Sequence, residues 1–337
     1  QGYAYSNNNH VYFEVNKFED YGKLSNKKLD ELIAGSRVEV SEFKKNPEDF
    51  VLWKPSADGE PSWESPWGKG RPGWHLECSA MSKRYLGDEF DIHGGGLDLK
   101  FPHHEDEIAQ SCGASGKSPA NIWMHANMLN VNGKKMSKSL GNFFLPQEIV
   151  DGSSTLFSKP YSPQVIRFFM MQSHYRSTLD LTEEALNASE KGFERLQLSM
   201  ELLENAPVSE SSSFGVPLLI QSFYDAMNDD FNAPILIANL FDAVKKINLI
   251  HDKKETINAG DKAFLLNEMK SFIHDVLGLN FGLSKADDRL EPVMDLVLEL
   301  RQNARDKKDW DTSDLIRDGL KNAGIEVKDG KENTNWK

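Results

Sequence analysis

Three residues in the first third of the chain have the chemistry of metal ligands. His103 and Glu107 stand four positions apart, so a helix would place their imidazole and carboxylate on one face. Cys78, in the segment Trp74-His-Leu-Glu-Cys-Ser79, offers a thiolate as a third ligand. Sulfur, nitrogen and oxygen ligands together suit zinc better than magnesium or calcium, and three protein ligands with one open position describe a catalytic zinc site.

The spacing of these residues does not by itself establish a metal site. A histidine and a glutamate four positions apart are common, and spacing alone favours a plainer interpretation: a helix-start histidine and a small buried cysteine. His75 and His104 lie in the same two segments and are rival ligands.

The segment before the metal pair is rich in glycine. Gly94, Gly95 and Gly96 follow the strand-like run Glu89–His93, and a glycine-rich turn lets backbone amides approach a nucleotide closely. Asp98 could then accept hydrogen bonds from ribose hydroxyls. The triplet lacks the full dinucleotide fingerprint, and many such runs bind nothing, so the signal is weak by itself.

The most specific string in the chain is Lys135-Met-Ser-Lys-Ser139. Clustered lysines usually mark a solvated basic loop. However, two lysines on a short loop bounded by Gly133 and Gly141 could close over a triphosphate and neutralise charge as pyrophosphate leaves.

The elements around these residues predict an α/β layer with a parallel sheet. We expect one helix over Trp74–Leu86, ended by glycine, and a second from about Pro102 to Cys112, with proline in its first turn. Ile122–Val131 is predicted as a buried strand region, and Asn132-Gly133 is a hairpin signal.

The ends of the chain differ in pattern from this layer. Before residue 68 we expect strands at Val11–Val15 and Phe50–Trp53, a short helix at Ser25–Ala34, and a loop over Trp63–Gly73. After about Pro163 the pattern is helical, with three apolar stripes. Their members are Leu186, Phe193, Leu196, Met200 and Leu203; Leu236, Leu240, Val244, Ile247 and Ile250; and Phe264, Glu268, Phe272 and Val276.

A serine-rich break and a final unit complete the helical part. Pro207 with Ser209–Ser213 predicts a flexible connection and a domain boundary. The final unit is predicted to contain helices at Val293–Arg305 and Thr312–Ala323 and a strand at Ile325–Lys328.

Composition places limits on the class of protein. The 337 residues allow two or more domains, and 39% apolar with 27% charged residues fits a soluble globular protein. A net charge of −13 argues against nonspecific coating of nucleic acid, although 301–337 is nearly balanced in charge. No apolar run would span a bilayer, no leader is seen, and two cysteines make no disulfide framework, so we expect a cytoplasmic protein without a membrane partner.

Taken together, these motifs resemble those of the cysteinyl-tRNA synthetases, a family of class I aminoacyl-tRNA synthetases. Lys135–Ser139 is the KMSKS motif of that class, and Gly73–Met81 and His93–Glu107 resemble the two zinc-bearing segments of the family. The resemblance continues through Asp229–Pro234, Ala304–Trp310 and Ser313–Asp318, in the same order, and covers essentially the whole chain.

The resemblance implies a role for each candidate residue. Cys78, His103 and Glu107 would hold one zinc ion per subunit, and Trp74 would line a pocket for cysteine. Asp98 and the three glycines would hold the adenosine of ATP, while Lys138 and Lys135 would assist the departing pyrophosphate. Candidates for contact with an anticodon, about equally well explained as a solvated helix face and a core tryptophan, are Arg301, Arg305, Lys307, Lys308, Trp310 and Arg317.

The implied activity is ATP-dependent ligation of L-cysteine to its tRNA through a cysteinyl-adenylate, with magnesium accompanying ATP, by a monomer. The implied fold is an α/β Rossmann-like catalytic domain followed by an α-helical bundle and a small anticodon-binding region. In order, we expect an insertion at 1–67, the second half of the catalytic domain with the KMSKS loop at 68–162, a helical stem at 163–207, a helical bundle at 214–283 and the anticodon-binding region at 284–337.

One departure from the family pattern opens alternatives. The sequence contains no HIGH motif and no cysteine that could serve as the fourth zinc ligand of the family, and it starts at Gln1 rather than methionine. We therefore expect a chain that lacks its N-terminal part and holds only part of the active site. The alternatives are a truncated, non-catalytic zinc- or tRNA-binding fragment and, less favoured, a ligase that joins cysteine to an amino sugar.

Overall fold

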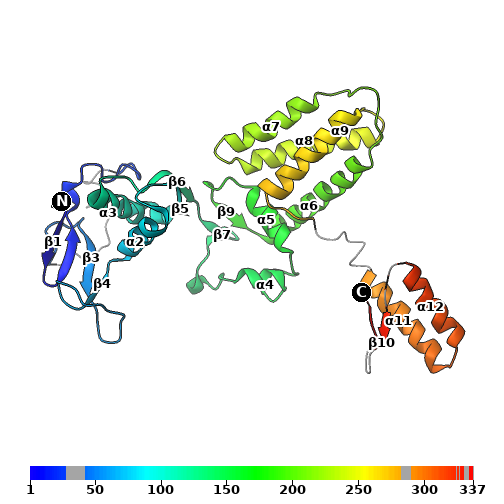
Figure 1. Ribbon diagram of the computed structural model, residues 1–337, viewed down its shortest axis with the longest axis horizontal. Coiled ribbons are helices and arrows are strands. Elements are labelled where there is room, and N and C mark those ends of the chain that lie inside the picture. Colours follow the sequence, from blue (N-terminus) through cyan, green and yellow to red (C-terminus); the bar gives the residue numbers. More distant parts are fainter. Residues whose placement is uncertain (28–41, 282–289, 324, 326, 330–333, 337) are drawn as a thin grey trace. The chain divides into compact units, whose positions relative to one another are not determined.

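The computed structural model describes residues 1–27, 42–281, 290–323, 325, 327–329 and 334–336 (Figure 1). The chain divides into two compact units, residues 1–268 and 269–337. Most of the helix expected at Ser25–Ala34 lies outside the described residues. Within the described part of the chain, no helix is both long enough and apolar enough to cross a membrane.

A four-stranded antiparallel sheet opens the first unit. Its strands are β1 (Ala4–Asn7), β2 (His10–Phe13), β3 (Phe50–Pro55) and β4 (Gly70–Pro72), in that order across the sheet. The strands expected near Val11 and Phe50 are confirmed. However, β4 lies inside the stretch expected to be a loop, so the sheet continues past residue 67.

Aromatic side chains pack this sheet against the rest of the unit. Phe13 is 2% exposed and stacks on Phe50 with ring centroids 5.0 Å apart. Tyr21 and Ala109 belong to the same buried cluster, and Ala109 comes from the helix that carries Glu107. The four-stranded sheet and the helix of the predicted metal ligand therefore share one core.

Helix α2 (Trp74–Leu86) begins directly after β4 and ends at Gly87, as predicted. Gly73 precedes it at a point where any β carbon would collide with the carbonyl oxygen of Val51, so only glycine fits. Gly87 has a φ of +95°, a left-handed conformation that glycine adopts without strain.

The parallel pair β5 (Phe90–Gly96) and β6 (Ala120–Ala126) is connected by α3 (Glu105–Ser115), which forms a β-α-β unit. The glycine triplet was expected to form the turn after the strand, and that expectation is wrong. Gly94, Gly95 and Gly96 remain in β5, because they pair in register with Met124, His125 and Ala126.

The turn instead covers the residues between β5 and α3. It consists of a 3₁₀ turn (Leu97–Leu99) and a wider turn (Lys100–His104), and α3 begins at Glu105 rather than Pro102. Phe101 has an extended backbone (φ −141°, ψ 132°), because a residue before proline avoids the helical region.

A second small sheet carries the lysine motif. Its order is β8 (Lys134–Lys135), β7 (Leu129–Val131) and β9 (Leu179–Leu181), with β7 antiparallel to β8 and parallel to β9. The single strand region expected at Ile122–Val131 is thus two strands. The Asn132-Gly133 hairpin is confirmed, and both residues have positive φ, as a two-residue hairpin turn requires.

Helices form the rest of the first unit. They are α4 (Pro146–Val150), α5 (Pro163–Met171), α6 (Glu183–Glu204), α7 (Val216–Asn228), α8 (Ala233–His251) and α9 (Ala259–Lys270), the last of which runs into the second unit. Every residue of the first two predicted stripes is buried, and α5, α6, α7 and α8 pack together. The third stripe is confirmed only at Phe272, which is buried: Phe264 and Val276 are each 43% exposed, whereas Leu265 and Ile273 are buried.

The serine-rich connection between α6 and α7 is ordered, contrary to the expected flexible break. The Ser209 amide donates to the Ile257 carbonyl at 2.8 Å, and the Ser213 amide donates to the Thr256 carbonyl at 3.0 Å. The Thr256 hydroxyl donates to the Ser211 carbonyl at 2.9 Å. Hydrogen bonds to the α8–α9 connection therefore hold this segment in place, although its composition suggests a flexible one.

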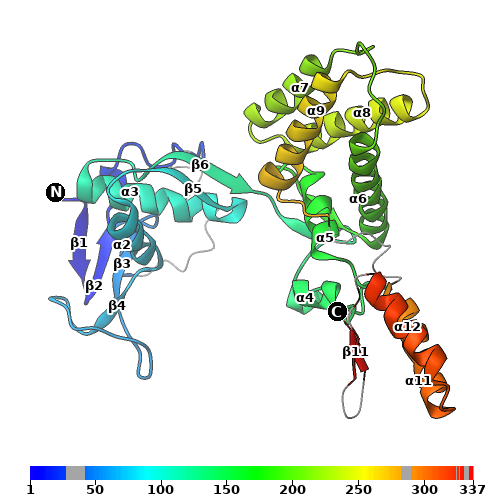
Figure 2. The same ribbon diagram turned by 45° about the vertical axis from the view of Figure 1, so that its right-hand side comes forward.

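The second unit contains a helical hairpin and a strand hairpin. Helices α11 (Leu290–Asp306) and α12 (Trp310–Asn322) lie side by side in Figure 1 and Figure 2, and both were predicted. A wide turn (Ser271–Val276) precedes them, and β10 (Val327–Asp329) pairs with β11 (Thr334–Trp336) after them.

Candidate metal and nucleotide site

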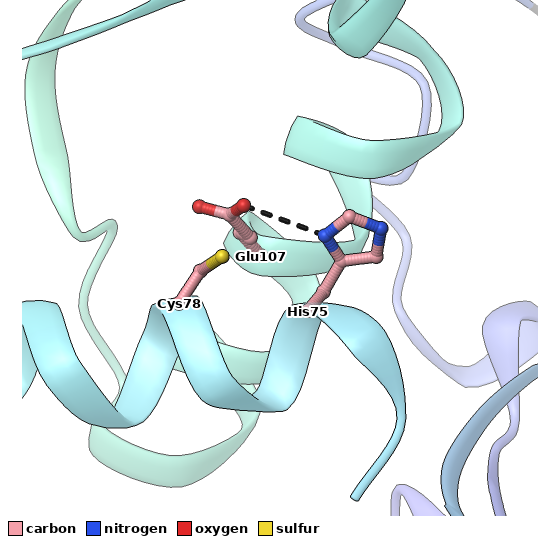
Figure 3. Close-up of side chains that lie close together, drawn as sticks. All are labelled: His75, Cys78 and Glu107. Atoms are coloured by element: carbon pink, nitrogen blue, oxygen red, sulfur yellow. Dashed lines mark ion pairs between the residues drawn. The ribbon is translucent and has the colours of Figure 1, made fainter.

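A cluster of possible metal ligands lies between α2 and α3 (Figure 3). His75 and Cys78 come from one face of α2, and Glu107 comes from the first turn of α3 and points toward both. One ligand atom of each residue lies within 4.8 Å of those of the other two. His75 Nδ1 is 3.4 Å from Glu107 Oε1. The fold therefore brings a thiol, an imidazole and a carboxylate together.

His103 lies beside this cluster. Its Nδ1 is 2.6 Å from Nε2 of His75. Of the three predicted ligands, the structure thus joins Cys78 and Glu107 directly, whereas His103 reaches them through His75. Because His75 is a rival candidate from the sequence, the choice between the two histidines stays a prediction.

A second group of histidines surrounds the other oxygen of Glu107. His93 Nε2 is 3.5 Å from Glu107 Oε2, and His104 completes a group whose ligand atoms again lie within 4.8 Å of one another. His104 Nδ1 is in turn 2.9 Å from His125 Nε2. The sequence did not single out His93 or His125 as ligands, because their proximity depends on the pairing of β5 with β6.

Burial controls the protonation of these groups. It lowers the pKa of His104 to about 4 and also lowers the pKa of His103, where repulsion from His75 adds to the effect. Burial likewise raises the pKa of the Cys78 thiol, and the Glu107 carboxylate raises it further. His103 and His104 are thus neutral near pH 7, the form in which a nitrogen lone pair binds a metal.

The cluster fits a zinc ion by its chemistry. His75 Nδ1 is buried and has no hydrogen-bond partner, since its 3.4 Å contact with Glu107 lacks hydrogen-bond geometry. Cys78 is partly buried, and a thiolate beside the Glu107 carboxylate is unfavourable unless a cation offsets the negative charge. An unpartnered nitrogen, a sulfur and a carboxylate are the donor types that zinc prefers.

The glycines of β5 leave room for neighbouring side chains. A β carbon on Gly95 would lie 2.7 Å from Cε1 of His104, and one on Gly96 would collide with the Asp98 carboxylate. A β carbon on Gly94 would make only an ordinary van der Waals contact, 3.9 Å from the Met124 carbonyl oxygen. Two of the three glycines are thus needed for packing, and Asp98 lies directly against the strand end.

Trp74 forms an aromatic wall next to the cluster. Its ring centroid is 4.5 Å from that of His103 and 5.1 Å from that of His75, and the residue is 64% exposed. The open face of this indole could contact a small substrate.

The lysine motif lies on the β7–β8 hairpin and the turn after it. Ser137 donates its amide to Asn142 Oδ1 at 2.9 Å, and Asn142 Nδ2 donates to the Lys135 carbonyl at 3.1 Å, which closes the loop on itself. Lys135 and Lys138 are exposed, and Lys138 Nζ is 5.3 Å from the centroid of the Phe143 ring. Both ammonium groups are therefore available to an anionic ligand.

Comparison with known proteins identifies the family. The family model for the tRNA synthetases class I (C) catalytic domain matches residues 1–191, the DALR domain matches 222–282, and the cysteinyl-tRNA ligase anticodon binding domain matches 287–336. A cysteine–tRNA ligase from Heliobacterium modesticaldum is 45% identical over the whole chain, which covers 72% of that relative. One from Bacteroides fragilis is 46% identical over the whole chain, which covers 70% of it.

The chain belongs to the cysteine–tRNA ligase family of class I aminoacyl-tRNA synthetases. It is therefore an enzyme of the class that charges tRNA, as its motifs indicated. The crystal structure of a putative arginyl-tRNA synthetase from Campylobacter jejuni aligns with 82% of the chain, which covers 57% of that protein, at 13% identity and a TM-score of 0.48. That likeness is too weak to add to the assignment.

The region that matches the anticodon-binding domain holds the remaining predicted residues. Arg301 is only 5% exposed, so it is a buried part of α11 rather than a surface contact. Trp310, at the start of α12, is 58% exposed and is free to stack on a base. Arg317 forms ion pairs with Asp314 and Asp318, which reduces the positive charge that it presents.

Proposed function

We propose that this protein ligates L-cysteine to its tRNA at the expense of ATP, through a cysteinyl-adenylate. Membership of the cysteine–tRNA ligase family supports the reaction class. The observation that carries the choice of cysteine is the approach of Cys78 and Glu107, which come from different helices and meet beside the exposed ring of Trp74.

Cys78 and Glu107, with His103 as the third ligand and His75 as the alternative to it, would hold a zinc ion. Such an ion would supply a preference for a thiolate over a neutral hydroxyl. That preference matters because serine differs from cysteine by one atom, and pocket shape separates such near-isosteres by only about 1–3 kcal/mol.

The other residues would bind and orient the two small substrates. Trp74 would bound one side of the amino-acid pocket, and Asp98 would accept hydrogen bonds from ribose hydroxyls of ATP. Lys138 and Lys135 would contact the phosphates of ATP, which would bind together with magnesium. The two ammonium groups would stabilise the negative charge that grows on the departing pyrophosphate.

The chemistry then follows in two steps. A carboxylate oxygen of cysteine attacks the α-phosphorus of ATP, and the bond to the β-phosphate oxygen breaks, which releases pyrophosphate. A hydroxyl of the terminal ribose of tRNA then attacks the acyl carbon and displaces AMP. The match of residues 287–336 to an anticodon-binding domain favours tRNA over an amino sugar as the acceptor.

Cysteine-dependent exchange of pyrophosphate into ATP tests this proposal in the intact protein. We expect exchange with cysteine and none above background with serine. We further expect Cys78→Ala to lose both exchange and bound zinc, measured by metal analysis. Cys112→Ala is the matched control, because Cys112 is also partly buried but belongs to neither group of candidate ligands. Normal exchange in a zinc-free Cys78→Ala protein would overturn the zinc role, and zinc binding without exchange in the wild type would favour a non-catalytic fragment.

A further inference from the structure

The turn between α7 and α8 has an unusual backbone. Asp230 has a φ of +55° and Phe231 a φ of +53°, so two successive residues with β carbons adopt the left-handed conformation. Bulky side chains rarely do so, because the β carbon crowds the following carbonyl group. Phe231 is also 53% exposed, and its ring has no aromatic neighbour among the described residues. Aspartate adopts this conformation comparatively readily, but neither the preference of phenylalanine nor burial of its ring accounts for it at Phe231.

The turn places Asp230 in contact with three successive residues. Its Oδ1 accepts a hydrogen bond from the Tyr175 hydroxyl at 2.7 Å, and its Oδ2 forms an ion pair with Arg176 Nε at 2.7 Å. Its main-chain oxygen is 3.2 Å from His174 Nε2. His174 Nδ1 accepts from the Arg176 amide at 3.2 Å, so Nε2 carries the proton and donates to Asp230. We call these four residues the Asp230 clamp.

The opposite side of the clamp is bonded to the β6–β7 connection. Asn127 donates its amide to the Tyr175 carbonyl at 2.8 Å and its side-chain nitrogen to the Arg176 carbonyl at 2.8 Å. Its side-chain oxygen accepts the Met128 amide at 2.7 Å. Asn127 therefore uses both ends of its side-chain amide to join the clamp to the start of β7.

The strand that follows the clamp also holds the lysine hairpin. β9 pairs with β7 in parallel, starting where the Leu179 amide donates to the Met128 carbonyl at 3.0 Å. At the far end, the Asn132 amide donates to the Leu181 carbonyl at 3.1 Å and the Gly133 amide to Asp180 Oδ1 at 2.8 Å. The hairpin is thus fixed on both sides by segments that meet at the clamp.

We propose that Asp230 is a positioning residue for the lysine motif, acting through His174, Tyr175 and Arg176. This inference rests on the proposed function and adds a residue to it. Without the carboxylate, Tyr175 and Arg176 lose their shared charged partner, and the clamp gains conformational freedom. β7 and β9 then hold the hairpin in one orientation for a smaller fraction of the time. Lys138 is consequently less often in place when charge develops on the phosphates, which lowers kcat rather than the affinity for cysteine.

Asp230→Asn tests the effect of the carboxylate separately from that of the turn's backbone. Asparagine has nearly the same size and tolerates the left-handed conformation at least as well as aspartate, so the turn keeps its shape. Asp229→Asn is the matched control, because Asp229 is in the same turn and its carboxylate accepts only from Asn232, at 3.3 Å, among the described residues. Two measurements apply to both variants: hydrogen exchange at individual amides, and cysteine-dependent pyrophosphate exchange.

For Asp230→Asn we expect the Asn132 and Gly133 amides to exchange about tenfold faster, while the amides of buried Leu196 and Leu240 keep their wild-type rates. We expect kcat to fall by about tenfold with KM for cysteine unchanged. We expect Asp229→Asn to match the wild type. Tyr175→Phe should shift the same amides by a smaller factor and add nothing when combined with Asp230→Asn, which also keeps the test valid if Asp230→Asn folds poorly.

If the Asn132 and Gly133 amides exchange at wild-type rates in both Asp230→Asn and Tyr175→Phe, the proposed positioning role of Asp230 is wrong. An equal effect of Asp229→Asn would lead to the same conclusion, because it would reveal a general response to charge in this turn. If the wild type shows no cysteine-dependent pyrophosphate exchange, the proposed function fails instead, and the amide rates still decide whether the clamp restrains the hairpin.

Discussion

His75 Nε2 and His103 Nδ1 lie 2.6 Å apart, so histidines from the two halves of the candidate metal site share one hydrogen bond. Only one of the two facing nitrogens can carry the proton. The arrangement makes one histidine the partner of the other, and it places both beside the same Cys78–Glu107 pair.

Substitution of each histidine in turn shows which of the two binds the metal and which orients the ligand. We expect His103→Ala to lose bound zinc and His75→Ala to weaken zinc binding by about 10–100-fold, the usual effect of removing a residue that orients a ligand. Metal titration against a chelator measures both, with Cys112→Ala as control. If the order of the two variants is reversed, His75 is the ligand and His103 its support.

Lys138→Ala should slow adenylate formation far more than it weakens the binding of cysteine, because the charge that Lys138 meets grows in the transition state. Steady-state pyrophosphate exchange gives kcat and KM separately. Lys134→Ala is a matched control, since Lys134 is an exposed lysine of the same hairpin outside the motif. A rise in KM with an unchanged kcat would assign Lys138 to ground-state binding.

Gly95→Ala should destabilise the fold by about 1–3 kcal/mol, because the new methyl group would lie 2.7 Å from the buried His104 ring. Gly94→Ala, one residue earlier in the same strand, makes only an ordinary contact 3.9 Å from the Met124 carbonyl oxygen and should be neutral or slightly stabilising. Urea unfolding of the two variants measures the difference. Equal stabilities would show that the His104 ring moves aside freely.

Tyr21→Phe should lower the free energy of unfolding by about 1–3 kcal/mol, because it removes the hydroxyl that donates to the buried Asp106 carboxyl at 2.6 Å. Tyr3→Phe is the control: Tyr3 stacks on Phe13 in the same aromatic group, and its hydroxyl has no hydrogen bond among the described residues. Similar losses in the two variants would indicate that the hydroxyl–carboxyl bond of Tyr21 adds no stability beyond that of an unbonded hydroxyl.

Helical regions were predictable because their apolar spacing and their end signals agree. The boundaries of α2 at Trp74 and Leu86 follow from a glycine on each side, and the buried faces of α6 and α8 follow from three- and four-residue steps. The start of the third stripe was misplaced because apolar residues occupy adjacent positions at Phe264 and Leu265, so two helical faces fit the pattern equally well.

Features that depend on pairing between distant segments could not be predicted. Gly94–Gly96 belongs to a strand only because β6 lies alongside it, and His125 approaches His104 for the same reason. The role of Asp230 was equally hidden, since its partners are more than fifty positions earlier in the chain. Residue types made Cys78 and Glu107 candidates, and the fold brings the two side chains together, but residue types and spacing could not rank His75 against His103.

The ordered serine-rich connection between α6 and α7 has a practical consequence for dissecting the protein. From its composition, Pro207 would be chosen as the point at which to truncate the chain and separate the helical domains. However, the Ser209 and Ser213 amides are hydrogen-bonded to the α8–α9 connection. Proteases should therefore find this segment a poor substrate. A fragment beginning just after α6 would also expose the buried face of α8 that α6 covers, and such a fragment should aggregate rather than behave as a free-standing module.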